Sequence, residues 1–567
     1  MDSQNLDLSF TILDHDPVRS PSTSKYDGDR TLSKTPCSES DENLQDLGAL
    51  RQGGIPSLWS RDYIGLVAQY AAVGLLFGTL PATVYPFFAN YLNMQGTQLV
   101  SARVLLGLPW SFKFFYGVFS DCIPIFGYRR RPLMILGWLL CFLMLALMAC
   151  MTVERPYFPS RDIAHMKSDL YTEDIMASIN TDAPASGGKF ILLMMLAAVG
   201  YVAADVAADS VVVELAQREP EKIRGRTQTT IYVVRTVFII FSNILVGVFF
   251  NGEHYNGGFD FALTFPQLML VLLALCVWVL PLTWFFIKES PHQGAKISCY
   301  LYDFWKILTL RPVYQVIAYK FFGGLLENYT VTCSDPIQTF WVKVTPQAEK
   351  VFTIAGQCVF ALTLYLTGKY GLHWNWRSMQ AYTLISVVAL DAFTTFCTVW
   401  DVFRSQWLWL GVPIVEYLPQ GIGFIVATYV VVELASEGNE ATIYGLLTTV
   451  SNLSAPFAST IAKKVDGNFD VDNDSIQNES FHVRKHVSIV YGIRYIVNLS
   501  ALMWLPLLPR QKAEAQALKR QGESCKWMGA FTIGYLSVAL IWSTVVNVLS
   551  IHPATTCLKF IGGKGCT

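Results

Sequence analysis

Two carboxylates stand four residues apart in a stretch of sequence that is otherwise apolar. Asp205 and Asp209 lie within residues 190–217, among small and aliphatic residues. On a helix, residues with this spacing share one face. Two acids side by side in a low-dielectric setting cannot both ionise easily, so the pair is suited to binding a proton. The alternative is a pair of structural acids that neighbouring helices hold by hydrogen bonds.

Basic residues and further acids also interrupt apolar stretches. Arg235 lies in the next stretch, residues 227–250, at a depth close to that of Asp209, and we predict that the two pair. An ionisable group in a membrane span is costly, so each is by default a candidate for substrate or proton binding. The other main candidates are Arg103, Lys113, Glu327 and Glu416. Lys320, Asp391 and Arg494 are further candidates, and Lys320 and Glu327 are predicted to share a helix face.

A short polar segment between two apolar stretches is predicted to act as a gate. Asp121 ends one stretch, and Arg129, Arg130 and Arg131 precede the next, with Gly127 suited to a tight turn between them. Asp121 can pair with these arginines or with a neighbouring helix, and breaking such pairs would open the cytosolic side. The alternative is that the arginines only anchor the loop in the cytosol. Glu214 and Glu433, near the ends of two other stretches, are predicted to be gating or helix-end residues.

The elements that position these residues are long apolar helices. The chain has 567 residues, 52% of them hydrophobic and 15% charged, whereas a soluble domain has about a quarter charged residues. About twenty apolar residues cross the hydrocarbon core, where the backbone must satisfy itself as helix. We predict spans at 62–89, 97–120, 131–152, 190–217, 227–250, 263–287, 313–341, 350–369, 378–400, 406–434, 441–462 and 486–508. A further stretch, 528–550, either spans the membrane or lies at its interface.

The distribution of charge sets the orientation. Lys and Arg are more frequent in the loops that become cytosolic when the N-terminus is cytosolic. Residues 1–57 are polar and acidic, and we predict a disordered cytosolic tail. Residues 465–485 then lie outside and carry two predicted glycosylation sites, Asn473 and Asn478. The net charge of −1 gives no sign of a nucleic-acid partner, whereas membrane lipid is an expected one.

A repeat divides the chain into halves. Val211-Val-Val-Glu-Leu-Ala216 recurs as Val430-Val-Val-Glu-Leu-Ala435, six spans later and therefore in the same direction. Parallel duplication is typical of the major facilitator fold, in which a pseudo-two-fold along the membrane normal relates two six-helix halves. The counterparts of Asp205 and Asp209 are Phe424 and Thr428, so the acids are expected in one half only. The predicted parts are 1–57 tail, 58–287 first half, 288–312 cytosolic connector, 313–508 second half and 509–567 C-terminal segment.

Several motifs resemble one family of this fold. Gly117-Val-Phe-Ser-Asp121, followed by Ile125-Phe-Gly127-Tyr-Arg-Arg-Arg131, resembles the major facilitator loop between spans 2 and 3, with two or three additional residues before the second glycine. This departure, together with Ala204-Asp205 and Ala208-Asp209-Ser210, is similar to the folate–biopterin transporter family. The resemblance implies a secondary active transporter. Members of the family carry folates, pterins or, in some cases, S-adenosylmethionine.

The site chemistry is compatible with such a cargo. A carboxylate can accept two hydrogen bonds from a pterin, and the carboxylates of a folate tail suit Arg or Lys. We therefore expect proton-coupled import of folate or pterin across the plasma membrane. The alternatives are a transporter of the same fold for another solute, such as S-adenosylmethionine, and a non-transporting receptor. The sequence contains no HExxH, GxSxG or Walker motif, so we expect no enzyme, cofactor or metal site.

Overall fold

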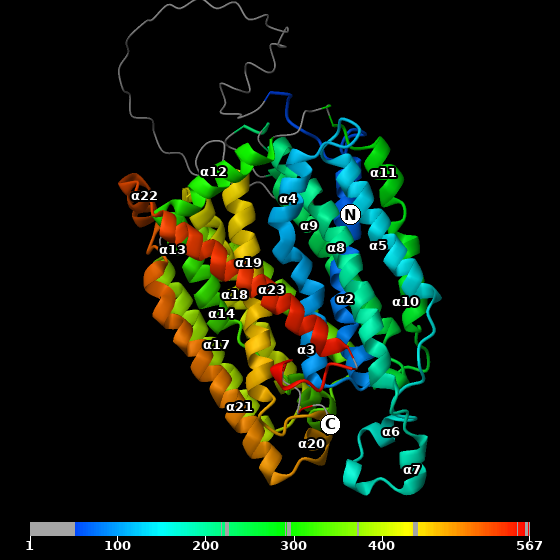
Figure 1. Ribbon diagram of the computed structural model, residues 1–567. Helices are drawn as coiled ribbons and strands as arrows, with labels where there is room; N and C mark the ends of the chain where they lie inside the picture. The colour runs from blue at the N-terminus through cyan, green and yellow to red at the C-terminus, as the bar shows by residue number, and fades with distance from the viewer. Residues whose placement is uncertain are drawn as a thin grey trace, which may run out of the picture.

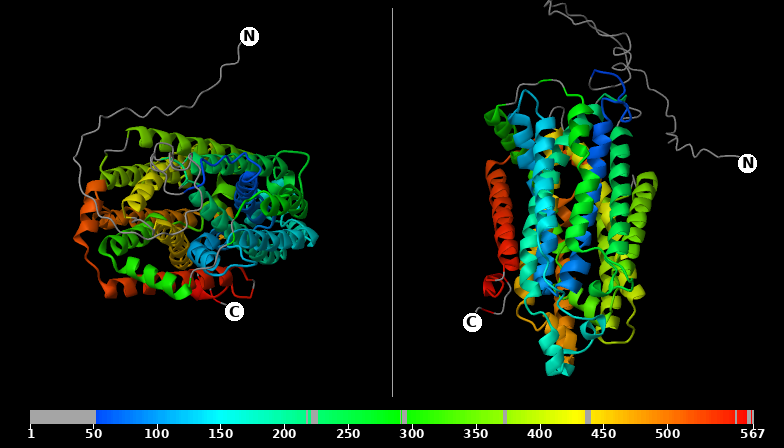
Figure 2. Two further views of the ribbon diagram at one scale, coloured as in Figure 1. Left: turned by 90° about the horizontal axis from the view of Figure 1, so that it is seen from above. Right: turned by 90° about the vertical axis from the view of Figure 1, so that its right-hand side faces the viewer.

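The protein is an all-helical bundle with two halves and one additional helix. The computed structural model describes residues 52–216, 218–220, 226–289, 291, 296–370, 374–434, 440–552, 554–561 and 565. The predicted tail therefore lies almost wholly outside the described residues. In Figure 1 the first half runs from blue to green beside the second half, which runs from green to orange. Figure 2 shows the same two groups side by side when the bundle is viewed from above.

The first half contains six helical passes, and several of them are interrupted. Its main elements are α2 (Ile64–Ala82) with the π-helix η1 (Val84–Tyr91), α3 (Gly96–Gly107) with the 3-10 turn η2 (Leu108–Phe112) and α4 (Lys113–Cys122), α5 (Arg131–Cys150), α8 (Ala183–Ala216), α9 (Arg226–Phe249), and α10 (Phe265–Cys276) with α11 (Val279–Phe285). The loop between α5 and α8 carries α6 (Arg161–Ala164), η3 (Ser168–Leu170) and α7 (Glu173–Ser178).

The connector α12 (Ile297–Thr309) leads to the second half. The elements of that half are α13 (Arg311–Ala318), η6 (Tyr319–Gly323) and α14 (Gly324–Glu327), α15 (Ser334–Pro336) with η7 (Ile337–Trp341), α16 (Pro346–Tyr370), α17 (Trp376–Val399), α18 (Gln406–Leu434), α19 (Glu440–Asp466), α20 (Asn473–Asn478), and α21 (Phe481–Ser500) with η8 (Ala501–Leu507). After them come α22 (Lys512–Gln521) and α23 (Lys526–Ile551).

Helices coincide with every predicted span. Eight helical segments among the described residues are long and apolar enough to cross a membrane, and α23 is one of them. The protein is therefore an integral membrane protein. The continuous span predicted at 313–341 is wrong in one respect, because the helix breaks between Glu327 and Ser334. Helix α23 lies diagonally across α3 and α19 on the outside of the bundle (Figure 1).

The backbone repeats a detailed structure in the two halves. The π-helices η1 and η7 each end in a turn whose positive-φ residue is Asn93 in one half and Lys343 in the other. The Leu92 N–H donates to Phe87 O at 3.0 Å, and the Val342 N–H donates to Ile337 O at 3.0 Å. Corresponding residues of the two turns, such as Leu92 and Val342 or Phe87 and Ile337, are separated by the same number of positions in the sequence. The duplication predicted from a six-residue repeat is thus visible in backbone geometry that the repeat does not include.

Buried apolar side chains form two clusters. The larger fills the first half and continues into the second through residues such as Val331, Ile337 and Trp341. The smaller contains Ile307 and Trp376 and lies at the opposite end of the second half. We name the end with the α4–α5 loop the cytosolic end, following the prediction from loop charge, and the other the outer end. The two halves therefore share one apolar core at the outer end.

Several hydrogen bonds between the halves lie in the same region. Tyr85 donates to Val344 O at 2.9 Å, and Thr339 donates to Asn90 Oδ1 at 3.2 Å. The loop after α5 also takes part, because Gln477 Nε2 donates to Met166 O at 2.7 Å. All of these contacts lie near η1, η7 and α20. The structure is therefore closed at its outer end.

The stability of this outer closure should depend on pH, because the closure contains His165. Burial, and then the charges of Lys343 and Arg161, lower the pKa of His165 from 6.5 to about 4. Above pH 6.5 the imidazole is neutral in both folded and unfolded states, whereas between pH 6.5 and 4 the unfolded state binds the proton first. We therefore expect the closure to lose stability as the pH falls through this window.

Hydrogen exchange of residues 158–178, corrected for intrinsic rates, measures this loss. Protection at pH 5 should be lower than at pH 7 in the parent chain, and His165→Gln should flatten the difference. The matched control is His254→Gln, because His254 is an exposed outer histidine. Equal pH dependence in the parent and in His165→Gln would contradict the prediction.

Candidate functional site

One lysine bridges two acids inside the first half. Lys113 Nζ lies 3.2 Å from Asp205 Oδ2 and 3.1 Å from Asp209 Oδ2. Tyr70 donates from its hydroxyl to Asp209 Oδ1 at 2.5 Å. The Asp205 side chain is fully buried, whereas Asp209 is 22% exposed. We call Tyr70, Lys113, Asp205 and Asp209 the acid–lysine cluster. One of its acids is sealed and the other is accessible.

The local backbone explains how the cluster forms. The 3-10 turn η2 contains Pro109, which cannot donate a helical hydrogen bond. Lys113 begins α4 directly after this turn, so its direction differs from that of a continuous helix. Helix α8 carries both acids and packs closely on α5. The contact is so close at Gly200 that an added Cβ would lie 2.5 Å from Gly137 O. Such contacts between small residues are common where membrane helices pack.

The predicted pairing of Arg235 with Asp209 is wrong. Within the described chain no ion pair joins Arg235 to either acid, and Lys113 takes that place. The Arg235 guanidinium instead lies 4.8 Å from the centre of the Tyr232 ring. Tyr232 in turn packs edge-on against Tyr70 at 6.3 Å. Arg235 therefore borders the acid–lysine cluster through two aromatic rings.

The second half contains its own ionic cluster. Arg494 lies 3.1 Å from Asp391 and 3.9 Å from Glu416, and Tyr495 donates to Asp391 at 3.0 Å. Three helices, α17, α18 and α21, supply these groups. The sequence candidates Asp391, Glu416 and Arg494 therefore lie together in the second half, at positions that do not match Asp205 and Asp209 in the repeat. Each half places one cation between two carboxylates, with a tyrosine on one of them.

The broken helix of the second half is stabilised by two side chains. Asn498 Nδ2 donates to the carbonyls of Leu326, Glu327 and Tyr329 at 2.9, 3.0 and 3.2 Å. Asp466 accepts hydrogen bonds from the Thr332 N–H and hydroxyl at 2.7 and 2.9 Å. Backbone groups inside a membrane need such partners. Discontinuous helices often mark the binding site in transporters.

Glu327 ends the helix before this break, and its side chain is exposed. No ion pair within 4 Å joins it to Lys320 in the described part of the chain. Lys320 lies in the π-helix η6 and Glu327 in α14, and their shared face stays a prediction.

Arg103 connects the halves and lies apart from both ionic clusters. Its two terminal nitrogens donate to the two carboxylate oxygens of Asp335, which stands at the restart of the broken helix. Asp335 is 6% exposed. Gly96, at the start of α3, packs against the backbone of the same break, where a Cβ would lie 2.0 Å from Thr332 O. We call the Arg103–Asp335 pair the outer lock.

The predicted gate loop is bound by one acid of the first half and one at the start of the connector. Glu214 lies 3.8 Å from Arg129 and 3.7 Å from Arg130. Glu289 accepts hydrogen bonds from the backbone N–H groups of Arg129, Arg130 and Arg131 at 2.8, 2.9 and 3.0 Å. Glu289 thus caps the N-terminus of α5. It was not predicted, although an acid directly after the sixth span is a usable signal. The side chains of Asp121 and Glu433 lie outside what the structure describes.

The two predicted glycosylation sites differ in the structure. Asn473 is 3% exposed, and its Nδ2 donates to Asn93 Oδ1 at 3.0 Å and to Met94 O at 3.2 Å. A glycan on that nitrogen would remove these bonds, so the prediction for Asn473 is wrong for this conformation. Asn478, at the end of α20, is partly exposed and stays a prediction.

The described helices have the fold of the major facilitator class of membrane transporters. The chain is similar to two solved transporters of this fold. One is a D-xylose–proton symporter, with a TM-score of 0.52, 14% identity, and coverage of 79% of this chain and 98% of that chain. The other is the inward-open xylose transporter XylE from E. coli, with a TM-score of 0.51, 12% identity, and coverage of 81% and 99%.

The sequence comparisons confirm the resemblance to folate–biopterin transporters. The BT1 family model matches residues 74–164. The "Folate-biopterin transporter" of Synechocystis sp. is 22% identical over 466 residues, which are 80% of this chain and 82% of that protein. "Folate transporter 1" of Plasmodium falciparum is 33% identical over 87 residues, which are 15% of this chain and 17% of that protein. These relatives are transporters and not enzymes.

Proposed function

We propose that this protein imports folate or pterins across the plasma membrane together with protons. The acid–lysine cluster carries the proposal. Asp205 is fully buried, and its Oδ1 has no hydrogen-bond partner among the described residues. A buried carboxylate oxygen without a partner is costly, so a proton or a cargo donor would stabilise it.

The cluster suits both parts of this function. Lys113, Asp205 and Asp209 together hold one positive and two negative charges when all three are ionised, so one added proton makes the cluster neutral. A pterin ring presents two adjacent donors that match a carboxylate. An aromatic ring suitable for stacking lies beside the cluster: the centre of the Trp110 ring is 4.6 Å from Lys113 Nζ. The similarity to folate and folate–biopterin transporters supports this choice of cargo.

An uptake panel tests the cargo. Cells without their own carriers would express the chain and receive labelled folate, biopterin, S-adenosylmethionine and xylose at several external pH values. We expect accumulation of folate or biopterin that falls at alkaline pH and collapses with a protonophore. Accumulation of S-adenosylmethionine alone would replace the proposed cargo with that solute.

Purified protein in vesicles separates transport from mere binding. A transporter accumulates labelled cargo in the lumen when the outside is acidic, whereas a receptor binds without accumulation. Uptake that is independent of the pH gradient would discard proton coupling and leave the cargo assignment intact. Binding without any luminal cargo would overturn the whole proposal.

A further inference from the structure

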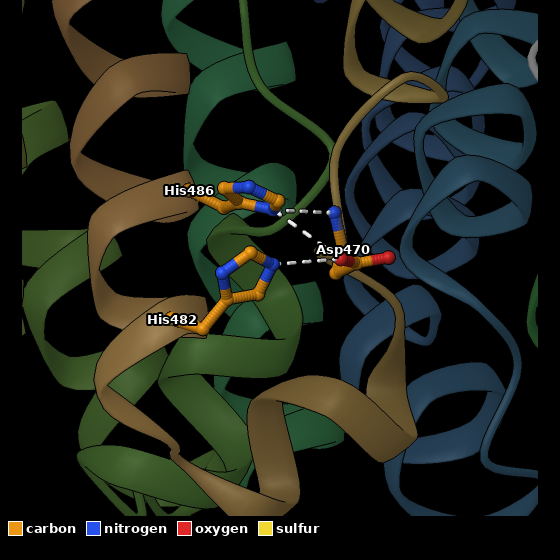
Figure 3. A group of neighbouring side chains, drawn as sticks. All are labelled: Asp470, His482 and His486. Carbon is orange, nitrogen blue, oxygen red and sulfur yellow. Dashed lines mark hydrogen bonds and ion pairs between the residues drawn. The ribbon is translucent and has the colours of Figure 1, made fainter.

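A group of three potential metal ligands lies on the outer surface of the second half, away from both ionic clusters. Asp470, His482 and His486 each offer one ligand atom, and these atoms lie within 4.8 Å of one another. Figure 3 shows the two imidazoles, from successive turns of α21, pointing toward Asp470 in the segment after α19. The described part of the chain contains one such group. We propose that this group is an external binding site for a divalent transition-metal ion such as Zn²⁺.

The spacing of the ligand atoms fits a tetrahedral ion. Asp470 Oδ2 lies 3.2 Å from His482 Nε2 and 3.5 Å from His486 Nδ1. Two ligands at the usual zinc distances, about 2.0–2.2 Å, are roughly 3.3 Å apart across a tetrahedral angle. The ligand atoms of His482 and His486 lie within 4.8 Å of each other, so a single ion can contact all three atoms once the two imidazoles approach it. Water would complete the coordination, because Asp470 and His482 are 46% and 64% exposed.

The hydrogen bonds in this group leave an unfavourable contact that a cation would relieve. The Asp470 N–H donates to His486 Nδ1 at 3.0 Å, so this nitrogen is an acceptor. It nevertheless faces the carboxylate oxygen of the same aspartate, which is also an acceptor. Binding of a metal would replace the bond from the Asp470 N–H with a bond from Nδ1 to the ion.

The surroundings hold His486 in this arrangement. His482 and His486 are one helical turn apart, and their ring centres are 4.0 Å from each other. Phe469 packs edge-on against His486 at 5.6 Å. His486 is only 20% exposed, so its ring has little freedom to turn away. Imidazole with one carboxylate favours zinc and its neighbours over the hard ions Mg²⁺ and Ca²⁺.

The consequence of binding is local stiffening of the outer end. The ligands join α21 to the segment between Asp466 and Asn473. Asp466 holds the broken helix, and Asn473 contacts the first half. A bound ion would therefore fix the segment that links these two contacts. Occupancy of this site does not depend on which solute the protein carries.

Thermal unfolding of the full chain tests the site. The protein would be purified without a histidine tag, treated with EDTA, and titrated with Zn²⁺, with Mg²⁺ as the hard-ion control. Because an ion that binds the folded state raises Tm, we expect saturable stabilisation by several degrees with Zn²⁺ and none with Mg²⁺. Loss of an outer-shell partner costs roughly 10–100-fold in metal affinity, so loss of a direct ligand in His482→Ala should shift the response by about 100-fold or more in zinc concentration, and His254→Ala should leave it unchanged.

Cobalt substitution gives a second measurement that does not depend on stability. Co²⁺ in a tetrahedral site absorbs visible light strongly, and this absorption should appear in the parent chain and vanish in His482→Ala. His482 is exposed, so its replacement should leave folding intact. The proposal is overturned if the parent shows no saturable zinc response, or if His482→Ala responds like the parent in both measurements.

Discussion

Replacing Lys113 with alanine should lower uptake by at least about 100-fold. The lysine is the cation within 4 Å of both Asp205 and Asp209, and the first of these acids is fully buried. Removing one partner of a buried ion pair costs about 3–5 kcal/mol, because an uncompensated charge remains. Each 1.4 kcal/mol is about a factor of ten in an equilibrium. The loss can appear as less folded protein or as folded protein that does not cycle.

Two measurements separate these outcomes. Membrane abundance is followed by fluorescence of a fused reporter, and uptake is expressed per folded molecule. Lys189→Ala is the matched control, because Lys189 is exposed on the helix that carries both acids. We expect this control to behave like the parent in both measurements.

A charge-balanced double variant distinguishes a working site from a scaffold. Lys113→Gln with Asp209→Asn removes one positive and one negative charge, so the cluster keeps its net charge. We expect abundance to recover while uptake stays low, since the proton site between the two acids is gone. Recovery of uptake together with abundance would show that the cluster only holds α4 to α8.

The sequence identified the charged residues of this cluster as candidates, but it did not predict which of them form ion pairs with one another. Asp205, Asp209 and Lys113 are recognisable because charges inside apolar spans are rare and costly. The partner of Asp209 was wrong because Lys113, which begins α4 after the 3-10 turn at Leu108–Phe112, lies 3.1 Å from it, whereas Arg235 lies against the Tyr232 ring. Counting residues along an ideal helix cannot reveal such a turn.

Residues whose roles depend on distant partners were harder to find. Asp335 lies inside a predicted span, but its importance follows from contact with Arg103 in the other half. Glu289 stabilises the start of α5 because it accepts hydrogen bonds from three backbone N–H groups that are far from it in the sequence. His482 and His486 show helical spacing in the sequence, yet Asp470 joins them only through the turn between α19 and α21. Local pattern gave the spans and the duplication, whereas these contacts depend on tertiary structure.

Breaking the outer lock should open the outer end of the protein. Asp335 is 6% exposed and receives both hydrogen bonds of Arg103 across the interface between the halves. In Arg103→Ala the buried carboxylate loses its cation, at a cost of about 3–5 kcal/mol to the closed state. Opening that end lets water reach the carboxylate, so the equilibrium shifts toward the open state. We expect a shift of roughly 100-fold or more and a corresponding loss of uptake.

A cysteine at Thr339 reports on this opening. Thr339 is 6% exposed and bonds to Asn90 across the same interface, so it becomes accessible only when the halves separate there. In a background without the exposed native cysteines, a membrane-impermeant maleimide added outside should label Thr339→Cys at least ten times faster when Arg103 is alanine. Arg404→Ala is the matched control, because it breaks the bond from Arg404 to Glu479 inside the second half alone.

Exchanging the two charges provides the decisive comparison. Arg103→Asp combined with Asp335→Arg restores opposite charges across the interface, so labelling should slow and uptake should partly return. Such a rescue would show that the opposite charges hold the outer end closed. If only side-chain packing were involved, changing both residues would make the defect worse. If labelling of Thr339→Cys is equally slow with Arg103 and with alanine, the pair does not control the outer end. The closure would then depend on the apolar core that the halves share around Val331, Ile337 and Trp341.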